Sequence, residues 1–193
     1  MTARSTKVAI ASTVAVVGIG GASVYAFAGD DGPKASVGVA AVQGAPAADT
    51  AQASEQATAQ GKVPKKVLAA EKAVFDITNK QRRAHGCKAL RLAPTLTIAA
   101  RRHSDDMSKH HYFSHNSQNG TSPWTRMKRA GYPYSVGAEN IAMGYQSAKA
   151  VMVGWMKSPG HRANILNCRL KALGVGVHFG GYGPMWTQDF GFK

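Results

Sequence analysis

Three side chains in this 193-residue sequence have the chemistry of a binding or catalytic site: His115, Glu139 and His161. Imidazole and carboxylate groups exchange protons near neutral pH and hydrogen-bond strongly to each other. Each histidine stands where a helical pattern breaks, and Glu139 stands in an uncharged stretch that we expect to be partly buried, where a carboxylate needs a partner. The sequence has no His-Glu-x-x-His, no Walker loop and no Gly-x-Ser-x-Gly elbow. The residue types therefore indicate a site without identifying a reaction.

Periodic patterns indicate the elements that position these residues. Apolar residues recur at helical intervals in three segments, Thr121-Ser122-Pro123 predicts the start of a shorter helix, and the C-terminal alternation predicts a hairpin. The predicted helices cover residues 65–84, 94–110, 121–130 and 148–155, and the predicted strands cover residues 136–143, 173–179 and 185–190. This order favours an α+β fold, an α-β-α sandwich with helices on both faces of a small antiparallel sheet. His103, at the edge of an apolar helix face, is expected to be packed and hydrogen-bonded.

The first residues predict export. Arg4 and Lys7 precede an uncharged run, residues 8–28, that ends in Ala-Phe-Ala, a small-x-small cleavage signature. We interpret residues 1–28 as a secretory signal peptide, whose removal would leave no transmembrane segment in the mature chain. The alternative is an uncleaved membrane anchor, because a helix over this run would extend about 31 Å. Both interpretations place the rest of the chain outside the cytoplasm.

The remaining chain divides into a linker and one domain. Residues 29–61 are dominated by small and polar residues that cannot offset the entropy of ordering, so we expect a flexible Ala-rich linker. Residues 62–193 are long enough for one domain and hold 21 Lys or Arg residues against six Asp or Glu residues, a net charge of +15. Such a surface attracts anions without specifying which ones.

Two cysteines, Cys87 and Cys168, complete the candidates. In an exported chain, an even pair without Cys-x-x-Cys spacing is most simply one disulfide bond. It would close a loop of 81 residues and stabilise the domain by on the order of 4 kcal/mol. The alternative is a nucleophilic cysteine, which has less support because neither residue is next to a His or Asp in the sequence.

At these residues the sequence resembles the CAP superfamily, also called SCP domains: cysteine-rich secretory proteins, antigen 5 and pathogenesis-related proteins. The matching segments are Tyr112-Phe113-Ser114-His115, Gly137-Ala138-Glu139-Asn140-Ile141-Ala142, the stretch from Trp155 to Leu166, Leu173-Gly174-Val175-Gly176-Val177 and Trp186-Thr187-Gln188-Asp189-Phe190-Gly191. They cover roughly residues 68 to 193 and are similar to a short bacterial branch. The resemblance implies an α-β-α sandwich and a central cleft in which two histidines and two acidic residues hold a divalent metal, usually zinc.

The resemblance carries three of those four positions over to this chain. His115 and His161 match the family histidines, and Glu139 matches the glutamate of its Gly-Glu-Asn motif. A second acid is missing where we look for it, because residues 145–157 contain no Asp or Glu. Asp189 could replace it, although no spacing supports this. The expectation is a ligand-binding cleft that holds zinc through three residues and a water molecule. The alternative is a hydrogen-bonded polar cluster without metal.

The function that follows is a secreted or cell-envelope protein that binds a lipid or an anionic envelope polymer without catalysis. The competing hypothesis is a zinc-assisted hydrolase acting outside the cell. Nucleic acid is a disfavoured partner because only the net charge supports such binding. No aromatic residues are interleaved with Arg and Lys in a stacking motif.

Overall fold

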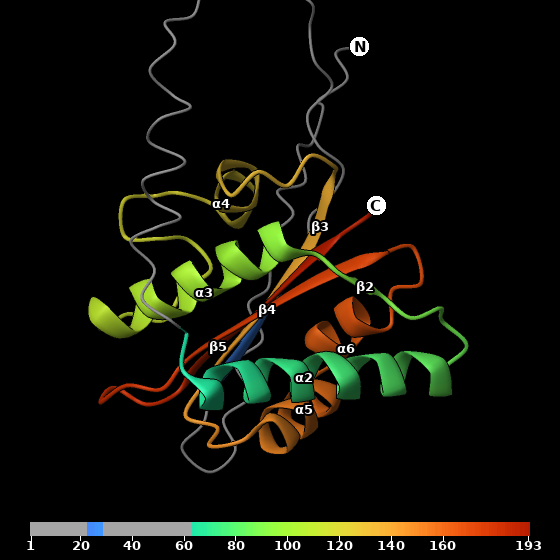
Figure 1. Ribbon diagram of the computed structural model, residues 1–193, viewed down its shortest axis with the longest axis horizontal. Helices are drawn as coiled ribbons and strands as arrows, with labels where there is room; N and C mark the ends of the chain where they lie inside the picture. The colour runs from blue at the N-terminus through green and yellow to red at the C-terminus, as the bar shows by residue number, and fades with distance from the viewer. Residues whose placement is uncertain (1–22, 29–62) are drawn as a thin grey trace, which may run out of the picture.

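The computed structural model describes residues 23–28 and 63–193 (Figure 1). The predicted linker lies outside the described residues, as does the predicted signal peptide except for its last six residues. The helices are α2 (Lys65–Ala84), α3 (Pro94–Lys109), α4 (Pro123–Arg129), α5 (Ala148–Lys157) and α6 (Pro159–Ile165). The strands are β1 (Ser23–Ala28), β2 (Arg91–Leu92), β3 (Val136–Met143), β4 (Ala172–His178) and β5 (Met185–Gly191). Among these residues, no helix is both long and apolar enough to span a membrane.

The strands form one sheet in the order β1-β3-β5-β4-β2. Helices α2, α5 and α6 lie on one side of this sheet, and α3 and α4 lie on the other (Figure 1). The predicted α+β sandwich is therefore confirmed. The sheet is mixed rather than purely antiparallel, because the two-residue strand β2 pairs in parallel with Ala172 and Leu173 of β4. The backbone of β1 pairs antiparallel with the outer edge of β3.

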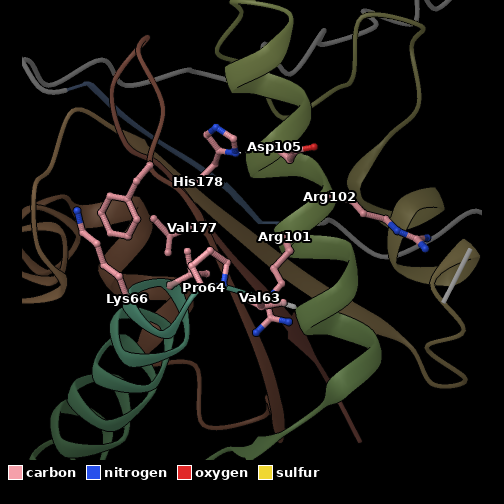
Figure 2. Close-up of a pocket in the computed structure, with 10 residues that line it drawn as sticks. Val63, Pro64, Lys66, Arg101, Arg102, Asp105, Val177 and His178 are labelled. Atoms are coloured by element: carbon pink, nitrogen blue, oxygen red, sulfur yellow. Dashed lines mark ion pairs between the residues drawn. The ribbon is translucent and has the colours of Figure 1, made fainter. Parts of the chain in front are cut away.

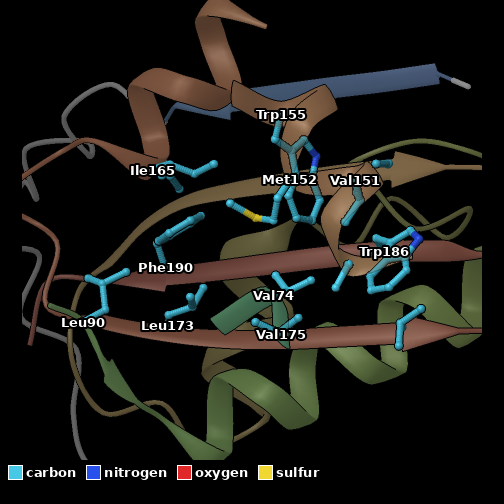
Figure 3. Packing of buried hydrophobic residues seen from close by; sticks show 14 of the residues in the cluster. Val74, Leu90, Val151, Met152, Trp155, Ile165, Leu173, Val175, Trp186 and Phe190 are labelled. Atoms are coloured by element: carbon cyan, nitrogen blue, oxygen red, sulfur yellow. The ribbon is translucent and has the colours of Figure 1, made fainter. Parts of the chain in front are cut away.

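Side-chain alternation along the strands separates two buried layers. Trp186 and Phe190 of β5 pack with Trp155 of α5 and Val74 of α2 in the larger apolar core (Figure 3). On the other face, Ile141 of β3 packs with Met107 of α3 and Met185 of β5. Neighbouring positions of β3 therefore face different helices, which decides where its polar side chains lie.

Arg82 holds α2 to the segment that follows α6. Its buried guanidinium group donates hydrogen bonds to the backbone carbonyls of Lys88, Ile165, Asn167 and Leu170. Burial lowers the pKa of Arg82, and the four carbonyl acceptors compensate for the lost hydration. The predicted disulfide bond is confirmed next to this arginine, where Cys87 and Cys168 are bonded.

Two glycines of β4 allow α3 to lie directly on the sheet. A Cβ atom on Gly174 would lie 2.1 Å from the backbone carbon of Leu96, and one on Gly176 would lie 2.3 Å from that of Ala100. Both neighbours are backbone atoms of α3, so the helix would have to move away from the strand. The close contact of α3 with β4 therefore requires glycine at both positions.

We predict that Gly174→Ala lowers the free energy of unfolding by about 1–3 kcal/mol, since the added methyl group overpacks a helix-sheet contact. Urea denaturation measures the change. Gly181→Ala is the control, because a Cβ atom there meets nothing within 4 Å. Equal stability of both variants would show that α3 is not held as closely as described.

Candidate functional site

Glu139 is the centre of the candidate site. It lies on β3, is fully buried and projects toward the α3 side of the sheet. One carboxylate oxygen, Oε1, accepts a hydrogen bond from Nδ1 of His115 at 2.7 Å. The other, Oε2, accepts one from the guanidinium group of Arg126, also at 2.7 Å. Both oxygens are thus held by cationic or polar groups, as a carboxylate at this depth requires.

Arg126 reaches this position because α4 starts at a defined point. The helix begins with Pro123, and the side chain of Ser122 accepts a hydrogen bond from the backbone N–H of Thr125. Arg126 also donates hydrogen bonds to the carbonyl of Thr121 at 3.1 Å and to the hydroxyl of Ser117 at 3.4 Å. Its side chain is only 11% exposed, so the guanidinium group forms a largely buried ion pair with Glu139.

His103 fixes the turn that carries His115. It lies on α3, is fully buried as predicted, and donates a hydrogen bond from Nε2 to the carbonyl of Ser114 at 3.0 Å. Burial lowers the pKa of His103 to about 4, which keeps the imidazole neutral at physiological pH. A neutral His103 orients the backbone next to His115 without adding a positive charge to the cluster.

The electrostatics of Glu139 follow from these neighbours. Burial by itself disfavours the ionised form, but three neighbours together have a larger effect. They are the positive charge that His103 carries below its pKa of about 4, the hydrogen bond from His115 and the charge of Arg126. Together they lower the pKa of Glu139 to about 2. Glu139 is therefore ionised throughout the physiological pH range.

Asp189 is the second acidic residue of the cluster. It lies on β5 directly opposite Glu139 in the register of the two strands, on the same face of the sheet, and is 1% exposed. Neither of its oxygens receives a hydrogen bond from a donor among the described residues. Burial and the adjacent charge of Glu139 raise the pKa of Asp189 well above its usual value. Within the pair, ionisation is therefore favoured at Glu139 and disfavoured at Asp189.

His161 belongs to a different polar layer. Its ring Nδ1 is 2.6 Å from the hydroxyl of Ser158, and its backbone carbonyl accepts a hydrogen bond from the side chain of Asn140 at 3.3 Å. Asn140 follows Glu139 on β3 and projects to the opposite face, where Asn164 of α6 donates to it at 2.9 Å. The structure therefore places the helix that carries His161 on the other side of the sheet from the Glu139 side chain.

This arrangement does not fit a bound metal ion. Within residues 23–28 and 63–193, no three His, Cys, Asp or Glu side chains are grouped closely enough to hold one. Both oxygens of Glu139 already have partners, and one of them is the cation Arg126. The expected zinc set of His115, Glu139 and His161 is not among such groups in the described residues, and we assign no chemical step to a metal.

Sequence reasoning missed Arg126 completely and gave no positional argument for Asp189. Nothing near Arg126 distinguishes it from the other basic residues, because its partner Glu139 is 13 residues away. Asp189 could have been placed from the hairpin and strand pairing, since it faces Glu139 only through the register of β3 and β5.

Comparisons with known proteins agree with the resemblance found in the sequence. The model of the "Cysteine-rich secretory protein family" (CAP) matches residues 75–190. The chain is 42% identical over 127 residues to "Uncharacterized protein YkwD" of Bacillus subtilis, which covers 66% of this chain and 49% of that protein. It is 36% identical over 120 residues to "Uncharacterized membrane protein YlbC" of the same organism, which covers 62% of this chain and 34% of that protein. The chain thus spans half or less of the length of these relatives.

Solved structures show the same fold. An extracellular protein containing a SCP domain from Bacillus anthracis has a TM-score of 0.63 and 31% identity, and covers 69% of this chain and 45% of that one. An outer surface protein from Borrelia burgdorferi has a TM-score of 0.57 at 20% identity, and covers 63% of this chain and 91% of that one. The second likeness supports the fold alone. With its sandwich, its disulfide bond and the match over residues 75–190, the chain belongs to the cysteine-rich secretory protein (CAP) family.

Proposed function

We propose that this chain works outside the cytoplasm as a non-enzymatic binding protein whose ligand is an anionic polymer or lipid of the cell envelope. The observation that carries the proposal is the state of its acidic residues. Residues 63–193 contain six of them, and five are buried or form an ion pair with Lys or Arg: Glu71, Asp76, Asp105, Glu139 and Asp189. The sixth, Asp106, accepts a hydrogen bond from the hydroxyl of Tyr112 and lies 2.8 Å from Nδ1 of His110.

Acidic residues that are paired with Lys or Arg contribute little negative charge to the electrostatic field around the protein. Glu71 is paired with Arg101, Asp76 with Lys72 and Asp105 with Lys109. Residues 63–193 also contain 20 Lys or Arg side chains. Most of those cations, including the exposed Lys65 and Arg162, have no acidic partner in the part of the chain that the structure describes. A surface of one sign attracts polyanions and anionic membranes over several ångströms.

The Glu139 cluster supports binding without catalysis. Glu139 and Asp189 are each at most 1% exposed, so a substrate would have to displace α4 or α3 to reach them. Arg126 and His115 already occupy the carboxylate. Both cysteines are in the disulfide bond, which leaves no thiol nucleophile. The cluster therefore serves to hold α4 and the preceding loop on the sheet.

The extracytoplasmic location rests on the predicted signal peptide and on the relatives. One structural relative is described as an extracellular protein and one sequence relative as a membrane protein. A basic domain on a predicted linker suits an envelope, where anionic polymers and lipid headgroups are abundant.

We predict that the purified protein pellets with isolated bacterial cell walls and with anionic phosphatidylglycerol vesicles at about 50 mM salt. Retention should fall at least tenfold at about 500 mM salt, since screening weakens contacts between exposed charges. Neutral phosphatidylcholine vesicles are the control and should retain little protein. Salt-independent retention, or retention by neither anionic surface, would contradict the proposal.

We predict that Glu139→Gln destabilises the domain by about 3–5 kcal/mol, because it leaves the buried cation Arg126 without its counter-charge. The double variant Glu139→Gln/Arg126→Met should recover part of the loss. Denaturant titration measures both. Asp76→Asn, which breaks the exposed pair with Lys72, is the matched control and should change stability by less than about 1 kcal/mol. A stable Glu139→Gln that no longer pellets with cell walls would instead indicate a ligand contact.

The competing hypothesis, a zinc-assisted hydrolase, predicts that the protein contains zinc. Because Arg126 occupies the carboxylate, we expect elemental analysis of the natively secreted protein to find well below one zinc ion per chain. A stoichiometric zinc content that His115→Ala abolishes would overturn the non-enzymatic proposal and require a rearranged cluster.

A further inference from the structure

A second feature of the domain is a polar pocket of about 270 Å³ between α3, α4 and the loop that joins them. A larger pocket lies beside α2 on the other side of α3 (Figure 2). The lining of the pocket at α4 includes three arginines and three polar residues of the loop. They are Arg102, Arg126 and Arg129, and Ser117, Asn119 and Thr121.

A tight turn holds the polar loop residues beside α4. The backbone N–H of Gly120 donates to the carbonyl of Ser117 at 2.8 Å, and the N–H of Ser117 donates to the carbonyl of Thr121 at 3.0 Å. Gly120 has a φ of 79°, which glycine adopts without strain. The side-chain oxygen of Asn119 accepts a hydrogen bond from the N–H of Thr121 at 3.0 Å. This contact leaves the side-chain NH₂ group of Asn119 available as a donor.

The three arginines reach the pocket from two helices. Arg102 belongs to α3, and Figure 2 shows its side chain extending away from the α2 side of that helix. Arg126 and Arg129 belong to α4. Arg126 is paired with Glu139, whereas Arg102 and Arg129 have no acidic partner among the residues that the structure describes. Two unpaired guanidinium groups therefore line one small pocket.

Asp106 also lines this pocket, but it does not cancel the charge of the arginines. One of its carboxylate oxygens lies 2.8 Å from Nδ1 of His110, and the other accepts a hydrogen bond from the hydroxyl of Tyr112. Within the described part of the chain, Asp106 forms no ion pair with an arginine of the pocket. If Asp106 and the buried Glu139 are both counted in full, the three arginines still leave a net charge of 3 − 2 = +1.

This lining suits a phosphate group. A guanidinium group presents its N–H donors in a planar fork that matches two oxygens of a phosphate. Donor capacity is left over here, because Nε of Arg126 has no acceptor among the described residues. The volume is below the range of about 300–1,000 Å³ typical of sites for larger ligands. Ala99 is the one apolar residue of the lining, so a hydrocarbon chain would find little to pack against.

We propose that this pocket binds the phosphate group of a polyol phosphate, such as a glycerol phosphate unit of an anionic envelope polymer. The phosphate oxygens pair with Arg102 and Arg129, and hydroxyl groups of the polyol hydrogen-bond to Ser117 and Asn119. The inference rests on the proposed binding role and names a ligand class for it. A neutral polyol would leave both guanidinium groups unpaired.

The test is an NMR titration of the ¹⁵N-labelled full-length protein with glycerol 3-phosphate, inorganic phosphate and glycerol at constant ionic strength. We expect both phosphate compounds to bind saturably, glycerol 3-phosphate more tightly, and glycerol to cause no shifts. The largest shifts should be those of the backbone amides from Ser117 to Thr121 and of α4. No saturable phosphate binding, or shifts confined to other parts of the domain, would overturn the inference.

The double variant Arg102→Gln/Arg129→Gln should weaken glycerol 3-phosphate binding by about tenfold or more, since it removes two charge-assisted contacts. Arg102→Lys keeps the charge but loses the fork, so it should still weaken binding. Arg83→Gln/Arg162→Gln is the matched control, because it removes the same charge from exposed positions outside the pocket and should weaken binding less than about twofold. Equal weakening by the two double variants would show that net charge alone attracts the phosphate, which would overturn the inference.

Pelleting experiments separate this inference from the general role and identify the source of the phosphate. Wild-type pelleting with cell walls but no phosphate binding in the titration would overturn the pocket alone, and loss of wild-type pelleting would contradict the general role. At constant ionic strength, glycerol 3-phosphate should release the protein from cell walls and not from phosphatidylglycerol vesicles. Release from the vesicles alone would assign the pocket to a lipid headgroup and overturn the assignment to a polymer.

Discussion

The burial of one ionised carboxylate constrains much of this domain. Glu139 is fully buried on β3, a strand with a neighbour on each side, where an isolated charge would be too costly to hold. It can remain there because Arg126 of α4 and His115 of the preceding loop reach its two oxygens. These polar contacts, together with the apolar packing of Tyr112, Phe113 and Met127, attach the seven-residue helix α4 and the loop before it to the sheet. The ion pair therefore acts mainly as a positional constraint on the segment between α3 and β3.

On the opposite face of β3, buried polar side chains are hydrogen-bonded to one another without net charge. Asn140 donates to Gln188, and Gln188 in turn donates to the hydroxyl of Thr78 on α2. Asn164 joins this chain from α6. Two polar layers thus lie back to back across β3, one ionic and one built of amides and a hydroxyl group. In both layers the polar side chains of β3 are hydrogen-bonded to neighbouring elements, which leaves the basic surface as the proposed binding region.

The sequence predicted local elements well and tertiary neighbours less well. Helices α2 and α3 and the hairpin of β4 and β5 follow from apolar periodicity and from Pro94, so they were predictable within a few residues. Helix α6 was missed because Pro159-Gly160 was interpreted only as a break, whereas proline is well suited to the first turn of a helix. Strand β2 is too short for any pattern. The partners of Glu139 depend on strand register and on the orientation of α4, and no local signal encodes these.

The most direct test of the account is an NMR titration of the side-chain carboxyl carbons of Glu139 and Asp189 in the folded protein. The account predicts that Glu139 stays ionised well below its ordinary pKa of 4.5, while Asp189 stays protonated well above its ordinary pKa of 3.8. Titration of both groups near their ordinary values would contradict it, because the carboxylates would then be solvated and not held by Arg126 and His115.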